Sequence, residues 1–191
     1  MEDRILELLK ESDALLTGHF LLSSGKHSDK YVQCAKLIQY PEKTEEVCKV
    51  IKKKIEEDDL KVDLVVGPAM GGIVIAYELG RALGVPAIFT ERENDVMTLR
   101  RGFIIPENAN VLVVEDVVTT GKSSFETIEV IEKNNANCVG IACLVDRTSG
   151  KDIGIKLYPA IKLEINTYEK EDCPLCKENK ELVKPGSRKK F

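Results

Sequence analysis

Residues 111–124 constrain the fold of this chain more than any other stretch. Four apolar residues, 111–114, lead into Glu115 and Asp116, and a polar Thr/Gly segment follows, ending in Ser123-Ser124. A buried strand that delivers two carboxylates and then a short loop before a helix is typical of the edge where open α/β sheets bind ligands. The N–H groups and hydroxyls of residues 119–123 can surround a phosphate at the helix N-terminus, where the helix dipole favours negative charge.

The acidic pair needs a partner of its own, since two carboxylates beside a phosphate repel it unless they bind something else. Ribose hydroxyls and a magnesium ion are the obvious candidates. Gly121-Lys122-Ser123 resembles the end of a nucleotide-binding P-loop, but that motif needs glycine where Asp116 stands, so we reject it. The alternative without function is a buried strand, a helix with a Thr N-cap and a solvated acidic rim.

The rest of the chain alternates short apolar runs with amphipathic stretches. Continuous apolar strands that alternate with helices indicate a mostly parallel sheet with helices on both faces, an α/β fold. Thr90–Gly102 is polar and is expected to be a loop. We expect strands at residues 30–35, 63–66, 86–89, 111–114 and 139–145, and helices near the N-terminus, from Pro41, at 73–83 up to Gly84, and after the segment 115–124 to about residue 134.

Composition excludes several classes of protein. Hydrophobic residues make up 43% and charged residues 31% of 191 residues, which suits one folded domain. A net charge of -4 gives no general attraction to nucleic acid or to an anionic membrane, so we expect neither as a partner. We see no secretory signal and no apolar run near the ~20 residues of a membrane span, and we expect a cytoplasmic protein.

Residues 111–124 resemble the phosphoribosyl pyrophosphate (PRPP) signature of type I phosphoribosyltransferases. The resemblance implies an α/β fold with a mostly parallel sheet flanked by helices and a small N-terminal hood. It also implies a single domain over residues 1–191, with a hood from about 1–40 plus part of the C-terminal segment and a core of about 41–165. In that family the loop holds the 5′-phosphate and the acidic pair holds the ribose hydroxyls. The PRPP-binding residues implied are Glu115, Asp116, Val117, Val118, Thr119, Thr120, Gly121, Lys122, Ser123, Arg92, Ala69, Met70 and Gly71.

Three further segments resemble orotate phosphoribosyltransferases within that family. Ser24-Gly25-Lys26-His27-Ser28 is similar to the turn of their hood, and Gly67–Gly72 is similar to their pyrophosphate loop. Leu144-Val145-Asp146-Arg147 matches the strand end whose arginine meets the orotate carboxylate, a task that suits a guanidinium fork. The tail from Asp172 to Arg188 is similar to that of a bacterial subgroup.

The resemblance implies a glycosyltransferase of pyrimidine biosynthesis that transfers the phosphoribosyl group of PRPP to N1 of orotate. Glu115, Asp116 and Arg92 are the implied catalytic residues, and Thr119, Arg147 and Lys26 are the implied orotate-binding residues. The implied cofactor is Mg²⁺, held mainly through the substrate. The implied assembly is a homodimer in which the loop 91–102 reaches the neighbouring site.

The chain departs from the family pattern at two loops. The better-known form has lysine at the position of Gly71, and its mobile loop is rich in lysine and carries a histidine. Residues 91–102 contain neither, so Arg92, Arg100 and Arg101 are the local cations that could meet pyrophosphate. For Arg100 and Arg101 the alternative is that they are solvated side chains of a loop without a role in binding. The family lysine of the hood turn falls on Ser23, which leaves Lys26 as a candidate there.

Cysteines and histidines give a weaker signal. Cys173-Pro174-Leu175-Cys176 has metal-ligand spacing, but the sequence holds no second CxxC and no HxxxH, so we favour a plain turn over a zinc site. The two histidines, His19 and His27, are expected to make surface hydrogen bonds, with a catalytic role as the alternative.

Two other functions compete with orotate transfer. A phosphoribosyltransferase for another base, such as a purine, would share residues 115–123 but lack the hood and the arginine suited to a carboxylate. A regulator that keeps the PRPP pocket as a sensor and binds nucleic acid is favoured by the missing lysine at Gly71. The net charge of -4 argues against it, since such a protein needs a basic face or added DNA-binding helices.

Overall fold

A six-stranded sheet forms the centre of the molecule. The computed structural model describes residues 1–22 and 24–185, and within them the strand order of this sheet is β5-β4-β3-β6-β7-β8. All neighbouring strands run parallel except β4 and β5, which are antiparallel, and this confirms the mostly parallel sheet. The strands are β3 (Leu64–Pro68), β4 (Ala87–Glu93), β5 (Val96–Leu99), β6 (Asn110–Val118), β7 (Asn137–Asp146) and β8 (Leu157–Lys162).

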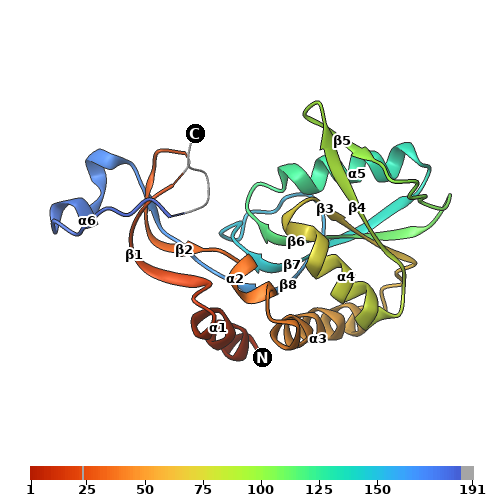
Figure 1. The fold of residues 1–191 in the computed structure, drawn as a ribbon, viewed down its shortest axis with the longest axis horizontal. Coiled ribbons are helices and arrows are strands. Elements are labelled where there is room, and N and C mark those ends of the chain that lie inside the picture. The colour runs from red at the N-terminus through yellow and green to blue at the C-terminus, as the bar shows by residue number, and fades with distance from the viewer. Residues whose placement is uncertain (23, 186–191) are drawn as a thin grey trace.

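Helices cover both faces of this sheet, as the apolar runs predict. Figure 1 shows α3 and α4 on one face and α5 on the other. Strand β6 supplies both cores, because Leu112 and Val114 point into the cluster beneath α3 and α4 while Val111 and Val113 point into the cluster beneath α5. The helices are α1 (Glu2–Glu11), α2 (Ala35–Ile38), α3 (Pro41–Glu57), α4 (Gly71–Leu83), α5 (Lys122–Lys133) and α6 (Pro174–Lys177), with a 3-10 turn at Lys170–Asp172.

Helix boundaries follow local sequence. Pro41 occupies the first turn of α3, where its missing N–H costs nothing. Gly84 ends α4 in the left-handed conformation, with φ 74°, as expected for a glycine that follows a helix. Helix α1 shares its buried leucines with the cluster beneath α3, so we propose that the hood begins at β1 rather than at residue 1.

A smaller antiparallel sheet lies at one end of the molecule (Figure 1). It consists of β1 (Leu15–Leu21), β2 (His27–Val32) and β9 (Thr167–Tyr168), in that order. The chain returns to it near its C-terminus, where the N–H of Leu21 donates to the carbonyl of Val183 at 2.8 Å. We call this sheet and residues 170–183 the hood.

Two expectations about the hood need correction, and a third is not tested. The strand expected at residues 30–35 begins at His27 and ends at Val32, and α2 follows it. His19 and His27, expected at the surface, are only 3% and 2% exposed, because the returning C-terminal segment covers them. Ser23 and the tail 186–191 lie outside the described residues.

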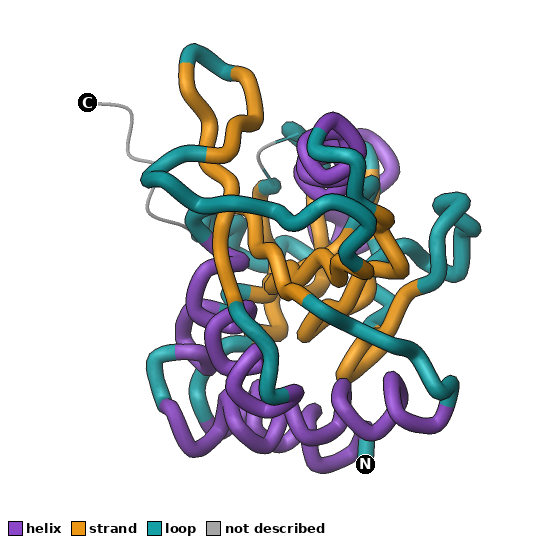
Figure 2. The backbone as a smooth tube through the Cα atoms, turned by 90° about the vertical axis from the view of Figure 1, so that its right-hand side faces the viewer, coloured by secondary structure: helices purple, strands orange, loops and turns teal. Residues whose placement is uncertain are grey.

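The segment 90–102, expected to be a loop, is largely a β-hairpin. Strand β4 continues to Glu93, and Glu93 pairs with Val96 across the two-residue turn Asn94-Asp95. Both turn residues have positive φ, 50° and 64°, as the type I′ turn of a two-residue hairpin requires. The hairpin extends beyond the rest of the sheet (Figures 1 and 2).

No helix among the described residues is long and apolar enough to cross a membrane.

Candidate active site

The carboxylate pair lies inside strand β6 rather than after it. The strand continues to Val118, so Glu115 and Asp116 are held by ladder pairing with β7, in which Glu115 lies opposite Cys143. Both side chains are half-buried, whereas Thr119 and Thr120 immediately beyond are exposed. The acidic pair is therefore fixed by the sheet, and the loop that follows is open to solvent.

The loop after β6 forms a hollow suited to an anion. Gly121 caps α5 with φ 74°, a conformation that favours glycine, and its carbonyl accepts the first helical bond, from Phe125 N–H at 2.8 Å. The N–H groups of the first helical turn therefore have no helical acceptor and face the hollow. Its volume is about 100 Å³, several times the roughly 30 Å³ of a water molecule. It is lined by Glu115, Val117, Thr119, Thr120, Gly121, Lys122, Ser123 and Ser124.

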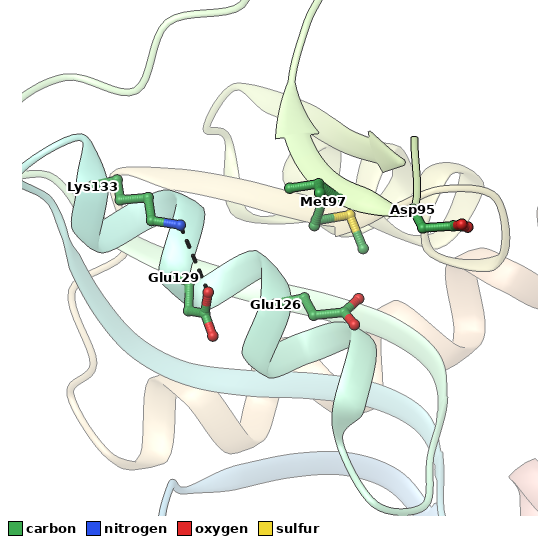
Figure 3. A pocket seen from close by; sticks show the side chains of 6 residues that line it. Asp95, Met97, Glu126, Glu129 and Lys133 are labelled. Carbon is green, nitrogen blue, oxygen red and sulfur yellow. Dashed lines mark ion pairs between the residues drawn. The ribbon is translucent and has the colours of Figure 1, made fainter. Parts of the chain in front are cut away.

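A larger hollow of about 200 Å³ lies between the β4–β5 hairpin and α5 (Figure 3). Its labelled lining side chains include three carboxylates, from Asp95, Glu126 and Glu129, and one cation, Lys133, which pairs with Glu129 at 3.7 Å. Negative charge of this kind repels a phosphate, so this hollow does not compete with the β6–α5 loop as an anion site.

The loop before α4 reaches the acidic pair through glycines. A Cβ on Gly72 would lie 2.6 Å from the carbonyl oxygen of Val114, and one on Gly67 would lie 2.4 Å from the carbonyl oxygen of Gly72. A Cβ on Gly71 would lie 2.8 Å from Oδ1 of Asp116. Only glycine lets the N-terminus of α4 pack this closely on β6, and the two loops named by the sequence thereby meet at one edge of the sheet.

This contact shows what a side chain at position 71 would meet. A lysine there would place its Cβ against the Asp116 carboxylate, so the side chain of Asp116 would have to move. In the same loop, the N–H of Ala69 already donates to the carbonyl of Thr90 at 2.7 Å, and the Ala69–Met70 peptide is cis. The first-turn N–H groups of α4 are the donors that remain for an anion.

Burial dominates the electrostatics of the acidic pair. Burial, and next the Asp116 carboxylate, raise the pKa of Glu115 to about 8, against a smaller effect of Arg92 that lowers it. Burial also raises the pKa of Asp116, although the N–H of Val117 donates to its Oδ1 at 2.8 Å. Among the ion pairs of the described residues, none includes Glu115 or Asp116. The pair is thus short of hydrogen-bond donors and of positive charge.

The cations expected at the loops pair with carboxylates instead. Arg92 contacts Glu126 of α5, and Lys122 lies 3.9 Å from the same Glu126. Arg100 pairs with Glu93 at 3.2 Å, and Arg101 pairs with Glu91 at 3.0 Å, within the hairpin. Of the three arginines, Arg92 alone lowers the pKa of Glu115.

Arg147 differs from these cations because it has no acidic partner. It follows β7, and its N–H donates to the carbonyl of Val118 at 2.8 Å, so it lies next to the β6–α5 loop. Its Nε is buried without a hydrogen-bond acceptor, and within residues 1–22 and 24–185 no carboxylate pairs with it. Burial lowers the pKa of its guanidinium, while Cys34 and Tyr31 nearby raise it.

Three neighbours of the site were not predicted from the sequence, and one residue that was predicted there, Lys26, has no described contact with it. Glu126 holds Arg92, the thiol of Cys34 lies 3.6 Å from the carbonyl oxygen of Asp116, and Tyr31 approaches Arg147 from β2. No local motif marks any of the three. Lys26 lies in the hood, where its Nζ is 2.6 Å from Oε1 of Glu169, and the contacts described for it do not reach the β6–α5 loop.

Comparisons with known proteins bear on this site. A family model described as the phosphoribosyl transferase domain matches residues 36–154. An orotate phosphoribosyltransferase of Caldanaerobacter subterraneus subsp. tengcongensis is 51% identical over 189 residues, which is 98% of both chains. The crystal structure of orotate phosphoribosyltransferase from Aeropyrum pernix is 27% identical, with a TM-score of 0.69 over 83% of this chain and 93% of that one. The structure of Leishmania donovani UMP synthase is 25% identical, with a TM-score of 0.70 over 84% of this chain and 36% of that one.

The raised pKa of Glu115 predicts how stability depends on pH. Between the ordinary value of 4.5 and about 8, the folded protein retains a proton that the unfolded chain releases, so Glu115 lowers the free energy of unfolding as pH rises through this window. We expect Glu115→Gln to raise the Tm at pH 9 by at least ~3 °C, which is about 1 kcal/mol for a chain of this size. At pH 4 the two proteins should unfold alike.

Thermal unfolding from pH 4 to pH 9 measures this difference. Glu129→Gln, at an exposed position on α5, is the matched control and should follow the wild type at every pH. A Glu115→Gln protein whose Tm runs parallel to the wild type across the range would contradict the prediction.

Proposed function

The chain belongs to the orotate phosphoribosyltransferases, and from that premise we propose that it transfers the phosphoribosyl group of PRPP to N1 of orotate. The products are orotidine 5′-monophosphate and pyrophosphate, and the reaction is a step of pyrimidine nucleotide biosynthesis. The observation that carries the choice of base is Arg147, a half-buried guanidinium without an acidic partner beside the phosphate loop. Orotate has a planar carboxylate, and a guanidinium fork binds such a group with two parallel hydrogen bonds.

PRPP binding follows from the two loops that meet at β6. The 5′-phosphate takes the hollow of residues 119–123 at the N-terminus of α5. Pyrophosphate takes the N–H groups at the start of α4, near Met70 and Gly71. The ribose lies between them, where Glu115 and Asp116 accept hydrogen bonds from its 2′- and 3′-hydroxyls.

The reaction is a displacement at C1′ of the ribose. The bond from N1 of orotate to C1′ forms as the bond from C1′ to the pyrophosphate oxygen breaks, with inversion, and the ring passes through a state with oxocarbenium character. The proton on N1 is released to solvent. Arg147 and Thr119 orient orotate, and the two loops orient PRPP, so proximity supplies much of the rate. The acidic pair lies where positive charge develops on the ring, and the negative charge of Asp116, joined by that of Glu115 once Glu115 has released its proton, stabilises that state.

The acidic pair also fits a magnesium-dependent reaction. Glu115 and Asp116 offer oxygen atoms, are half-buried and have no cation paired with them in the described part of the chain. Oxygen ligands suit Mg²⁺, which keeps much of its coordination on water and on substrate phosphates. When bound, Mg²⁺ supplies positive charge that orients the leaving pyrophosphate and stabilises it. We assign no firm protein ligand and propose that the substrate holds the ion.

Arginines take the place of the family lysines at the pyrophosphate end. Arg92 is our first choice, because it acts on the pKa of Glu115 and its partner Glu126 can release it. Arg100 and Arg101 stand on the hairpin, and their ion pairs with Glu93 and Glu91 are exposed and therefore weak. Lys26 remains a proposed contact of orotate, although it pairs with Glu169 in the hood.

A homodimer is supported by an apolar stripe on α4. Met70, Val74 and Tyr77 are 85%, 52% and 69% exposed and follow one another at helical spacing. Large apolar side chains gathered on one exposed face mark an interaction surface. We propose that a second copy covers this face and that the hairpin of residues 91–102 reaches the neighbouring site. Six free thiols suit a reducing compartment, and the cytoplasm is the proposed location.

The first prediction concerns Arg147. Arg147→Ala should lower kcat/KM for orotate by roughly 10²- to 10³-fold, because an anion bound in a half-buried site loses its partner. Arg147→Lys should recover only part of it, since an ammonium lacks the fork. The assay follows the loss of orotate absorbance with PRPP and Mg²⁺, and adenine and guanine are tested in parallel. Turnover of a purine but not of orotate would point to a different base, and full activity of Arg147→Ala would remove the arginine from the site.

The glycines of the α4 loop predict a contrast between two variants. Gly71→Ala pushes only on the carboxylate of Asp116, so we expect an unchanged Tm and a fall of about tenfold or more in kcat/KM for PRPP. Gly72→Ala pushes on the backbone of β6 at Val114, so we expect loss of stability instead. Kinetics and thermal unfolding of both proteins separate the two effects. A fully active Gly71→Ala would show that Asp116 need not keep its position.

The α4 stripe predicts the oligomeric state. Val74→Glu places a charge in the proposed interface, so sedimentation equilibrium should change from dimer to monomer. Leu182→Glu, at an exposed apolar position in the hood, is the control and should remain dimeric. A wild type that sediments as a monomer at all concentrations, or a dimeric Val74→Glu, would place the interface elsewhere or remove it.

A further inference from the structure

Four metal-binding side chains converge in the hood, far from the acidic pair in sequence. His19 comes from β1, His27 begins β2, Cys173 immediately precedes α6 and Cys176 lies within it. One ligand atom from each lies within 4.8 Å of all the others. Figure 1 shows α6 beside the end of the β1–β2 sheet. We call these four residues the His/Cys cluster.

The distances within the cluster are those of a tetrahedral site. Zn–S bonds of about 2.3 Å and Zn–N bonds of about 2.0–2.1 Å place sulfur and nitrogen ligands about 3.6 Å apart. The thiol of Cys173 lies 3.5 Å from Nε2 of His19, and the thiol of Cys176 lies 3.7 Å from the same atom and 3.3 Å from Nδ1 of His27. The two nitrogens are 2.8 Å apart and need to separate by about 0.6 Å to admit the ion.

The hydrogen bonding of His19 fixes the tautomer in which Nε2 can bind a metal. Its Nδ1 lies 2.9 Å from the carbonyl oxygen of Lys180, which can only accept a hydrogen bond, so the proton is on Nδ1. The lone pair of Nε2 is then directed at the two thiols and His27. A second ring nitrogen that donates to a backbone carbonyl is the usual support of a metal-binding histidine.

Burial makes the cluster costly without a ligand. His19, His27 and Cys173 are 3%, 2% and 0% exposed. Phe20 and Leu175 are buried beside them, yet neither belongs to either hydrophobic cluster of the core. A small sheet whose third strand has two residues gives the hood little apolar surface to bury. Small units of this kind are commonly held by a metal or by disulfides.

We propose that the His/Cys cluster binds one structural zinc ion that joins β1 and β2 of the hood to the C-terminal segment. Two thiolates and two neutral imidazoles complete a tetrahedral set, and such a closed set is typical of structural rather than catalytic zinc. The site closes chain loops of more than 140 residues, since Cys173 follows His19 by 154 positions. It also fixes His27 at the end of the hood turn that carries Lys26.

Metal content tests the assignment directly. Protein purified without chelators from zinc-supplemented cells should contain about one zinc per chain by mass spectrometry of the metal. His27→Ala and Cys176→Ser should each reduce it at least about tenfold. Cys138→Ser is the matched control, since its half-buried thiol bonds Gly140 in β7, and it should keep the full content.

Two measurements on the wild type keep the test independent of how the variants fold. Protein stripped by a chelator and titrated with Co²⁺ should show thiolate-to-cobalt charge transfer and the visible bands of a tetrahedral site. Zn²⁺ added to the stripped protein should raise its Tm by roughly 5 °C or more. Wild type without zinc, without these bands and with a Tm indifferent to Zn²⁺ would overturn the proposal. So would a Cys173–Cys176 disulfide found by peptide mapping of the unreduced protein.

Discussion

The close approach of helix α4 to strand β6 is the contact on which the active site depends. Gly72 brings the backbone of α4 against that of β6, and Gly67 of β3 brings β3 against the same turn of α4, so a larger residue at either position would displace a backbone. The start of α4 therefore lies against the end of β6, and the N-termini of α4 and α5 flank the same acidic pair. A substrate with a phosphate at each end can span both helix N-termini only because of this packing.

The acidic pair and Arg147 lack ion-pair partners of opposite charge within the described part of the protein. Glu115 and Asp116 are acidic groups short of cations and donors, and burial raises the pKa of Glu115 to about 8, so the free protein keeps the proton of Glu115 at neutral pH. Arg147 is a positive group short of an acceptor. Each deficit destabilises the free protein, and under the proposed function each is relieved by the matching part of PRPP, Mg²⁺ or orotate. A protein that keeps such groups gives up some stability for binding, as active sites commonly do.

The core and the PRPP loop were predictable because their signals are local. An apolar run followed by two acids and a Thr/Gly segment determines β6, its loop and α5 within fourteen residues. Strand β8 escaped prediction because Pro159 interrupts its apolar pattern, which an edge strand tolerates. The hairpin escaped because Asn94-Asp95 was not recognised as a type I′ turn, although both residue types accept positive φ. Arg147 was found through a resemblance, whereas Glu126, Cys34 and Tyr31 reach the site through tertiary packing that no local pattern records.

In the hood, too, the residues that meet cannot be identified from local sequence patterns, and here they are the farthest apart in the chain. Sequence motifs for zinc are recognised by ligands at short spacings. By that criterion Cys173 and Cys176 form one pair of ligands without a second pair. Their partners lie about 150 residues earlier, one in each strand of a hairpin, and become neighbours only when the chain returns to the hood after β8. A core can be recognised from many weak apolar signals spread along the chain. A four-ligand site concentrates its information in four residues, so the fold must be known before they can be counted together. That difference explains why the loop proposed to bind phosphate could be predicted from the sequence, whereas the cluster that we assign to holding the hood in place could not.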